Sequence, residues 1–406
     1  MGNARSLRAC LLMLVVCSGT ARAQGLPSEP LVFGGGRIVV SGDVSVTTSC
    51  AHTPGAAACT SDTGYFNFSD YEDSTLRMLR LGLSSSLRLS DRLSALGEVR
   101  MENANAPRPY GAYLRFSPFA GKAFDIQAGR IPSTFGAFAR HAYSTDNLLI
   151  GYPLAYQYLL SLRPDAVPTS TDDLLRMRGR GWLSSFPLGS ATAAAGLPIA
   201  NAFRWDTGVQ VRGVVRWVEA AASVTAGSLA RPLFRDDNHG RQFAGRVALR
   251  PVAGLVLGAS ASRAPYVTRD VDLRGARAED FVQHAFGADA EFSRDHYLLR
   301  FEAVRSRYTL PTLTPTLSAL ATMFEGRYRL TPRTHVAARW DHLGFSTVTS
   351  PSRTDTWEAP VTRIEVGGGL TLQRNVQVRV AVQRNTRDGG RVRRLTAVAA
   401  QLLYWF

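Results

Sequence analysis

Apolar and polar residues alternate with a period of two along most of the chain. In residues 376–382, "VQVRVAV", every second residue is valine, and Gln377, Arg379 and Ala381 lie on the opposite face. The same alternation, with arginine or glutamate on the polar face, recurs in 79–89, 209–217, 243–250 and 320–330. Strict alternation predicts strands with one apolar and one polar face. No comparably long stretch has a helical period, so the pattern predicts an all-β chain.

The breaks between these stretches are alternately short and long. Short breaks lie at 90–92, 117–122, 186–190, 218–221, 250–254, 293–296, 331–334 and 373–375. Longer polar stretches lie at 48–73, 103–109, 132–173, 198–206, 228–241, 264–280, 308–318, 346–359 and 386–391. Short turns at one end and long loops at the other are typical of a transmembrane β-barrel. Eight hairpins, with strands at 36–47 and 394–406, predict an antiparallel up-and-down barrel of about 18 strands, with 16 as the alternative.

The N-terminal residues have the pattern of a secretory signal. Arg5 and Arg8 precede the apolar run "ACLLMLVVC", and "ARA" precedes Gln24. This order predicts a signal peptide over residues 1–23, cleaved after Ala23. A membrane anchor is the alternative, but the apolar run is shorter than the ~20 residues that span a bilayer. We therefore expect a signal peptide at 1–23, a periplasmic lead at 24–35 and the transmembrane barrel at 36–406.

The charge of the chain is basic and is carried almost wholly by arginine. The formal charge is +15, and loss of the three arginines of the signal peptide, with no acid, lowers it to +12. The only lysine is Lys122. The arginines are spread along an exported chain, which argues against a nucleic-acid partner. Small phosphorylated or carboxylated solutes, outer-membrane lipid and lipopolysaccharide are the expected partners.

Two cysteines remain after the signal peptide is removed. Cys50 and Cys59 flank the small-residue stretch "AHTPGAAA". A close pair in an exported chain predicts a disulfide that closes a small loop. Two free thiols are the alternative, and no metal site is expected because no CxxC motif or histidine cluster accompanies the pair.

The C-terminal segment resembles the assembly signal of Gram-negative outer-membrane barrels. Val398, Ala400, Leu402, Tyr404 and Phe406 lie on one face of the last predicted strand. An apolar final strand ending in phenylalanine is similar to the signal that the barrel-assembly machinery recognises. The resemblance implies a cell outer-membrane location, assembly through that machinery, and a signal role for Tyr404 and Phe406.

A second resemblance lies at 125–139, "DIQAGRIPSTFGAFA". Its "AGRxPxxFG" segment is similar to one in the phosphate-selective porin group and related general porins. The resemblance implies a constriction-loop motif formed by Gly129, Arg130, Pro132, Phe135 and Gly136, and a homotrimeric assembly. The near absence of lysine departs from the phosphate-selective type. We therefore expect a general anion preference rather than phosphate specificity.

The long segment 132–173 follows this motif. It contains several tyrosines and the apolar stretch "NLLIGYPLAYQYLLSL", so it is not expected to be disordered. Loops of this length are usually functional. Folding into the lumen as a constriction is the favoured interpretation, and an external cap packed on neighbouring loops is the alternative.

Arginines on the polar faces are the candidate anion pathway. Guanidinium keeps its charge and offers a planar fork to phosphate or carboxylate. Those with no acidic neighbour in sequence are Arg80, Arg88, Arg115, Arg176, Arg178, Arg180, Arg212, Arg216, Arg246, Arg250 and Arg379. The stretch "RMRGRG" at 176–181 would place three of them on one strand face, directly after the long loop.

These observations predict an outer-membrane porin. The expected function is a water-filled, anion-preferring channel for passive diffusion of small hydrophilic solutes. The alternative is a barrel that acts as an adhesin or surface scaffold through its external loops. No GxSxG motif is present, and we expect neither enzymatic activity nor a cofactor.

Overall fold

A computed structural model describes residues 27–406, except 69–73, 104, 203, 270, 272 and 274. The predicted signal peptide at 1–23 lies outside the described residues. In the described part of the chain, no helix has the length and apolar character needed to cross a membrane. The helical segments are short: η1 (Gly34–Gly36), η2 (Thr63–Phe66), η3 (Phe138–His141), α2 (Leu154–Gln157), α3 (Thr171–Arg176) and η4 (Ala278–Asp280).

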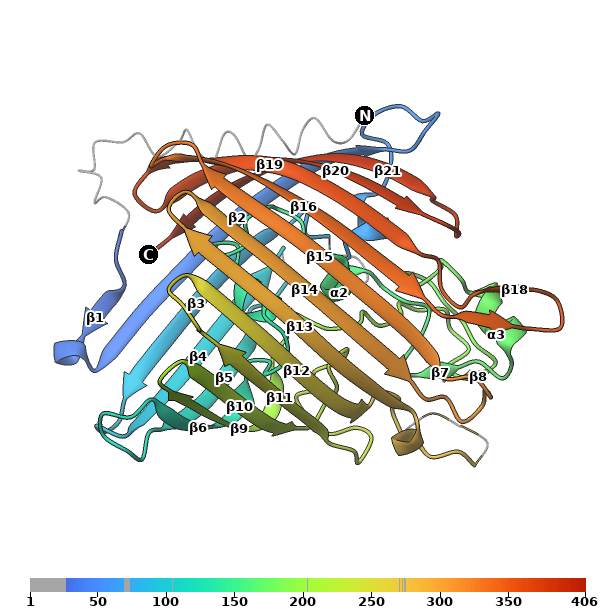
Figure 1. The fold of residues 1–406 in the computed structure, drawn as a ribbon, viewed down its shortest axis with the longest axis horizontal. Coiled ribbons are helices and arrows are strands. Elements are labelled where there is room, and N and C mark those ends of the chain that lie inside the picture. The colour runs from blue at the N-terminus through green and yellow to red at the C-terminus, as the bar shows by residue number, and fades with distance from the viewer. Residues whose placement is uncertain are drawn as a thin grey trace.

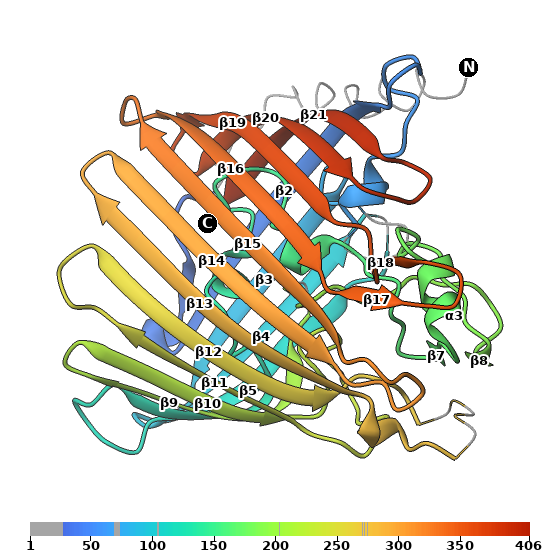
Figure 2. The same ribbon diagram turned by 45° about the vertical axis from the view of Figure 1, so that its right-hand side comes forward.

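Sixteen tilted antiparallel strands form a closed barrel (Figures 1 and 2). Each strand pairs with its sequence neighbour in the barrel, and β2 pairs with β21 to close it. The wall strands are β2 (Ile38–His52), β3 (Leu79–Arg88), β4 (Leu93–Glu102), β5 (Arg108–Phe116), β6 (Phe124–Ile131), β9 (Asp206–Val215), β10 (Val218–Thr225), β11 (Gln242–Leu249), β12 (Leu255–Pro265), β13 (Val282–Arg294), β14 (Tyr297–Tyr308), β15 (Leu317–Arg329), β16 (Thr334–Phe345), β19 (Val361–Gln373), β20 (Val376–Arg387) and β21 (Arg394–Trp405).

Among the described residues, five further strands lie outside this closed ring. They are β1 (Leu31–Phe33), β7 (Ala166–Val167), β8 (Leu188–Gly189), β17 (Thr347–Thr349) and β18 (Thr354–Thr356). β1 pairs with the first residues of β2, before β2 reaches β21. The other four form two small hairpins among the long loops.

The strand count is the lower of the two predicted values. The predicted hairpin around 186–190 is not in the wall, because residues 132–205 are one continuous connection between β6 and β9. The prediction of a turn at 218–221 was also wrong: those residues belong to β10, and the turn is Arg216-Trp217. Without the hairpin at 186–190, and with one turn moved to 216–217, seven hairpins remain. Their fourteen strands and the two flanking strands make the sixteen strands of the wall.

The alternating apolar and polar residues of the sequence lie on the outer and inner faces of the barrel, respectively. On β20, Val380 and Val382 are about half exposed on the outer face, whereas Arg379 and Ala381 are buried inside. On β15, Leu320 and Phe324 face outward and Glu325 is fully buried. Backbone groups pair from strand to strand around the closed ring, which is the condition for a sheet to survive in lipid.

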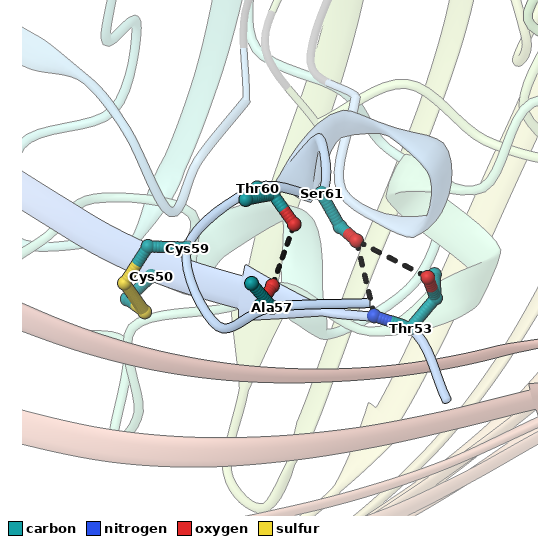
Figure 3. The surroundings of a disulfide bond; sticks show 6 residues. All are labelled: Cys50, Thr53, Ala57, Cys59, Thr60 and Ser61. Carbon is teal, nitrogen blue, oxygen red and sulfur yellow. Dashed lines mark hydrogen bonds between the residues drawn. A yellow bond between two sulfur atoms is a disulfide. The ribbon is translucent and has the colours of Figure 1, made fainter. Parts of the chain in front are cut away.

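Cys50 and Cys59 form a disulfide, as the sequence predicts (Figure 3). Cys50 lies on β2 opposite Val398, and its Cα is 4.4 Å from that of Cys59. The backbone N–H of Thr53 donates to Ser61 Oγ and fixes the base of the loop.

We expect both thiols to be oxidised in the exported protein. Alkylation without reductant followed by mass spectrometry should find neither cysteine modified. A Cys50→Ser/Cys59→Ser variant should retain the barrel, since the strand pairing of β2 does not depend on the bond. Quantitative alkylation of both residues in protein taken from the outer membrane would contradict the disulfide.

The last residue contributes to barrel closure. Phe406 N–H donates to Gly42 O at 2.9 Å, and Gly42 N–H donates to Phe406 O at 3.1 Å. A Cβ added at Gly42 would lie 2.7 Å from the Phe406 ring, so glycine makes room for that ring. Tyr404 pairs with Val44 on β2 and donates its hydroxyl proton to Pro27 O.

Deleting Phe406 should reduce the amount of folded barrel in the outer membrane while export continues. The deletion removes two backbone hydrogen bonds at the seam and the proposed assembly signal together. Heat-modifiable migration on gels measures the folded fraction. Phe406→Tyr is the control, because it keeps both backbone bonds and an aromatic terminus. A normal folded fraction after deletion would contradict both roles.

Candidate functional site: the lumen and its inward loop

The first part of the connection between β6 and β9 folds into the barrel, and a later part packs on the long loops at the barrel end (Figure 2). Buried loop residues, including Phe138, Tyr156 and Leu160, share one apolar cluster with small inward-facing wall residues such as Ala321 and Ala381. Residues 133 and 201 line one small cavity, so the loop leaves and rejoins the wall at neighbouring points. The inward interpretation is confirmed for the part of 132–173 around residues 135–157, which inward-facing wall residues hold. Residues 164–173 instead pack on neighbouring long loops, as the external-cap alternative expects. The whole connection extends to residue 205.

The "AGRxPxxFG" motif turns the chain into the lumen. β6 ends at Ile131, directly before Pro132, which has no N–H to continue the ladder. Phe135 is fully buried, and its ring lies against the inner face of β12 and β13 near Gly287. Gly129 has a φ of 130°, and a Cβ there would lie 2.4 Å from Ala112 O. Arg130 lies on the outer parity of β6 and donates to Tyr110 O.

Gly136 allows the loop to reach a buried carboxylate. Its φ is +76°, and a Cβ would lie 2.6 Å from Tyr156 Oη and 2.8 Å from Glu302 Oε1. Glu302 accepts from Ala137 N–H at 2.7 Å and from Tyr156 Oη–H at 2.8 Å. This wall carboxylate therefore holds two separate turns of the loop.

Wall arginines hold the middle of the loop through its carbonyl groups. Arg379 donates to Ser144 O and Asn147 O, both at 2.7 Å. Equivalent donations run from Arg339 to Gly151 O (2.9 Å) and from Arg363 to Tyr152 O (2.8 Å). Arg80 donates instead to a side-chain hydroxyl of the loop, Tyr152 Oη (2.9 Å). Since all four arginines are buried, they anchor the loop and do not face a solute path.

Acidic wall residues complete this anchor. Arg339 Nε donates to Glu325 at 2.9 Å, and both side chains are fully buried. Glu365 accepts from Gly151 N–H at 2.9 Å. Breaking a buried pair of this kind costs about 3–5 kcal/mol. The loop is therefore a fixed part of the lumen.

The predicted pathway arginines lie in several different settings. Arg80 and Arg379 hold the loop, and Arg246 pairs with Asp289 (2.7 Å) on the wall. Arg88 and Arg216 lie at the short-turn end, Arg216 in the turn itself with a φ of +52°. Arg115 donates to Tyr113 Oη. Arg176, Arg178 and Arg180 do not share a strand face, since α3 ends at Arg176 and an irregular turn follows.

Several of these arginines have acidic partners that lie far from them in sequence, so the sequence alone did not show the ion pairs. Arg80 pairs with Glu102 at 2.9 Å across the β3–β4 hairpin. Arg178 pairs with Asp355 and Asp388, both at 3.2 Å, on loops far away in sequence. The prediction that these arginines lack nearby acids was therefore wrong for several of them.

Three accessible arginines inside the barrel share a single carboxylate. Arg140 of η3, Arg212 of β9 and Arg250 at the end of β11 all contact Glu219 of β10, at 3.0, 3.1 and 2.9 Å. The three arginine side chains are 37%, 40% and 53% exposed, whereas Glu219 is 3% exposed. We call these four residues the Glu219 cluster. It carries two excess positive charges beside the base of the inward loop.

Arg140 and Glu219 are the members that sequence reasoning missed. Arg212 and Glu219 share the inner face of one hairpin, where Arg212 pairs with Ala221 and Glu219 with Val214. Diagonal neighbours at this spacing are within reach of long side chains. A turn at 216–217 makes Arg212 and Glu219 diagonal neighbours on the hairpin. The turn predicted at 218–221 instead placed Glu219 outside the strand, so the pair was not predicted. Nothing in the local sequence points to Arg140.

Comparison with known proteins identifies the fold. No protein-family model and no curated protein sequence matches the chain. Solved structures match over nearly its full length: OmpT, an outer membrane protein of Vibrio cholerae, at a TM-score of 0.57 and 9% identity, covers 92% of this chain and 99% of its own. The anion-selective porin from Comamonas acidovorans gives 0.56 and 10%, covering 91% and 99%.

The outer membrane channel DcaP of Acinetobacter baumannii matches at a TM-score of 0.55 and 12% identity, covering 93% of this chain and 100% of that one. A closed 16-stranded barrel narrowed by an inward loop, with these structural neighbours, has the fold of bacterial outer-membrane porins.

Proposed function

We propose that this chain is a porin of the Gram-negative outer membrane that forms a water-filled, anion-preferring channel for small hydrophilic solutes. Barrels of 16–18 strands are wide enough to enclose an aqueous channel. The observation that carries the anion preference is the Glu219 cluster, where three accessible guanidinium groups share one buried carboxylate. Fixed positive charge at a constriction favours anions.

Single-channel recording under a KCl gradient tests this proposal. We expect discrete conductance steps and a reversal potential of the sign that chloride permeation gives. The selectivity should be greater at low salt, where the Debye length is longer. No conductance from folded protein would overturn the channel and favour the adhesin or scaffold alternative. Conductance with cation preference would overturn the anion preference alone.

Contact with lipopolysaccharide is a further part of the proposal. Arg263, His284 and Arg307 are cross-strand neighbours on the outer face, near the long-loop ends of β12, β13 and β14. Arg305 lies on the same face, opposite Phe286. Charged side chains on a lipid-facing surface are costly at mid-bilayer but tolerated near its rim. Phosphate groups of the outer leaflet would complement this basic patch.

A homotrimer is the proposed assembly. Support comes from the trimer form of Vibrio cholerae OmpT, which matches at a TM-score of 0.53 and 10% identity, covering 91% of this chain and 99% of that chain. Light scattering of the detergent-solubilised protein would give the assembly mass directly.

A further inference from the structure

An arginine-lined cavity of about 670 Å³ lies among the long loops, separate from the Glu219 cluster. Three parts of the chain enclose it: residues 175–183 from the end of α3 onward, the β17–β18 hairpin, and the β20–β21 connection. These parts lie together at the long-loop end of the barrel in Figure 2. Six arginines line the cavity: Arg176, Arg178, Arg180, Arg353, Arg391 and Arg393.

Two of these arginines join the walls of the cavity to each other. Arg178 Nε donates to Thr356 O at 3.0 Å, and its Nη2 lies 3.2 Å from both Asp355 and Asp388. Arg353 Nη2 donates to Leu175 O at 2.5 Å. These contacts cross between segments about 180 or more residues apart in sequence. The cavity is therefore enclosed by specific interactions between loops.

Two glycines set the approach of the loops. Gly179 and Gly390 each have a φ of +72°, and a Cβ at Gly179 would lie 2.6 Å from Gly390 N. The Glu358 carboxylate accepts from Gly179 N–H, and from Ser161 N–H at 2.8 Å. Burial raises the pKa of Glu358, and the N–H groups of Ala359, Gly179 and Ser161 oppose that rise. The turn before Arg180 is therefore held by a hydrogen bond to Glu358 and by close packing against Gly390.

The remaining arginines leave the cavity strongly positive. Arg180, Arg391 and Arg393 are exposed and make no ion pair with any residue in the described part of the chain. Arg176 is 54% exposed and only 4.0 Å from Asp173. The carboxylates that contact lining arginines belong to Asp173, Asp355 and Asp388. Asp172, which accepts from Ser352 Oγ–H and interacts electrostatically with Arg353, is a fourth nearby carboxylate. Six guanidinium groups against four carboxylates give an excess of two positive charges.

We propose that this cavity binds compact anions that carry two or more phosphate or carboxylate groups. Several guanidinium forks in one enclosed space can each make charge-assisted, paired hydrogen bonds to such groups. Chloride offers no such pattern of acceptors. The cavity volume falls within the range of small-molecule sites. This inference deepens the proposed function by naming the class of anion that collects at the channel entrance.

The same chemistry could come from a free solute or from phosphate groups of lipopolysaccharide. Pyrophosphate is a suitable probe of the free form, and calorimetric titration of the folded protein in detergent without lipopolysaccharide measures its binding. We expect saturable binding that weakens at high salt. If purified lipopolysaccharide competes with pyrophosphate, the lipid phosphate groups bind in the same cavity. The proposed site is then supported, with lipopolysaccharide as the source of its phosphate groups.

The decisive variant is Arg180→Gln/Arg391→Gln/Arg393→Gln. It removes the three unpaired charges and leaves the contacts of Arg178 and Arg353 intact. We expect this variant to bind pyrophosphate at least about tenfold more weakly, because losing several charge-assisted hydrogen bonds costs about 1.4 kcal/mol or more of binding free energy. Arg92→Gln/Arg294→Gln/Arg333→Gln is the matched control, because it removes three exposed charges at the short-turn end of the barrel, away from the cavity and from the proposed lipopolysaccharide patch.

Absence of pyrophosphate binding to the wild type, or equal binding by the decisive and control variants, would overturn the inference. This measurement does not depend on conductance. A protein that conducts anions but fails to bind pyrophosphate would keep the proposed channel and lose the cavity site. A protein that binds pyrophosphate without conducting would keep the site and lose the channel.

Discussion

Excising residues 135–199 and joining Thr134 to Ala200 through a short Gly-Ser linker should raise the single-channel conductance several-fold. The removed segment fills the part of the lumen beside β13–β16 and β19–β21, and its buried side chains exclude water there. The junction is geometrically feasible, since residues 133 and 201 line one small cavity. The wall arginines and glutamates that held the loop would then face water and each other.

Folding of the excised variant is checked by heat-modifiable migration before any recording. A folded variant with the wild-type conductance would contradict the view that the loop narrows the channel. Gly136→Val provides a milder test. A β-branched residue at a φ of +76° is strained by about 1–2 kcal/mol, and its side chain would displace Tyr156 and Glu302. We expect noisy, rapidly fluctuating current from this variant. Gly121→Val, in a short turn at a φ of +72° with nothing near its Cβ, is the control, because it carries the same backbone strain and displaces no neighbour.

The barrel itself could be predicted from the sequence because its signals are local. Alternation along β15 and β20 fixes which side chains face lipid, and short turns separate neighbouring strands. The error in strand number came from residues 174–197. Their apolar and polar residues also lie close together between turn-like breaks, but they pack among the long loops instead of extending the wall.

The site could be predicted only in part, because its contacts join distant segments. The motif around Gly136 indicated where the chain turns inward. The sequence does not show which arginines form hydrogen bonds to the loop. Arg379, for example, donates to carbonyl groups of residues 144 and 147, more than 230 positions away. The positions of Arg180 and Arg391 in one cavity likewise depend on how three loops meet.

Neutralising the arginines of the Glu219 cluster should reverse the charge beside the constriction. Arg140→Gln/Arg212→Gln/Arg250→Gln leaves Glu219 as the only charge of the cluster, which changes from two positive charges to one negative. The reversal potential under a KCl gradient should shift toward cation permeability. The shift should grow at low salt, because screening within the lumen weakens as the Debye length increases.

Glu219→Gln should have the opposite effect. It removes the buried carboxylate and leaves three arginines whose side chains are 37–53% exposed, so anion preference should rise. Arg92→Gln/Arg294→Gln/Arg333→Gln removes the same number of exposed charges at the short-turn ends of other hairpins and should leave the selectivity nearly unchanged. Opposite shifts from the first two variants, with a silent control, would locate the selectivity at the Glu219 cluster. Shifts of the same sign, or a shift in the control as large as in the cluster variant, would show that overall charge sets the selectivity and that this cluster does not.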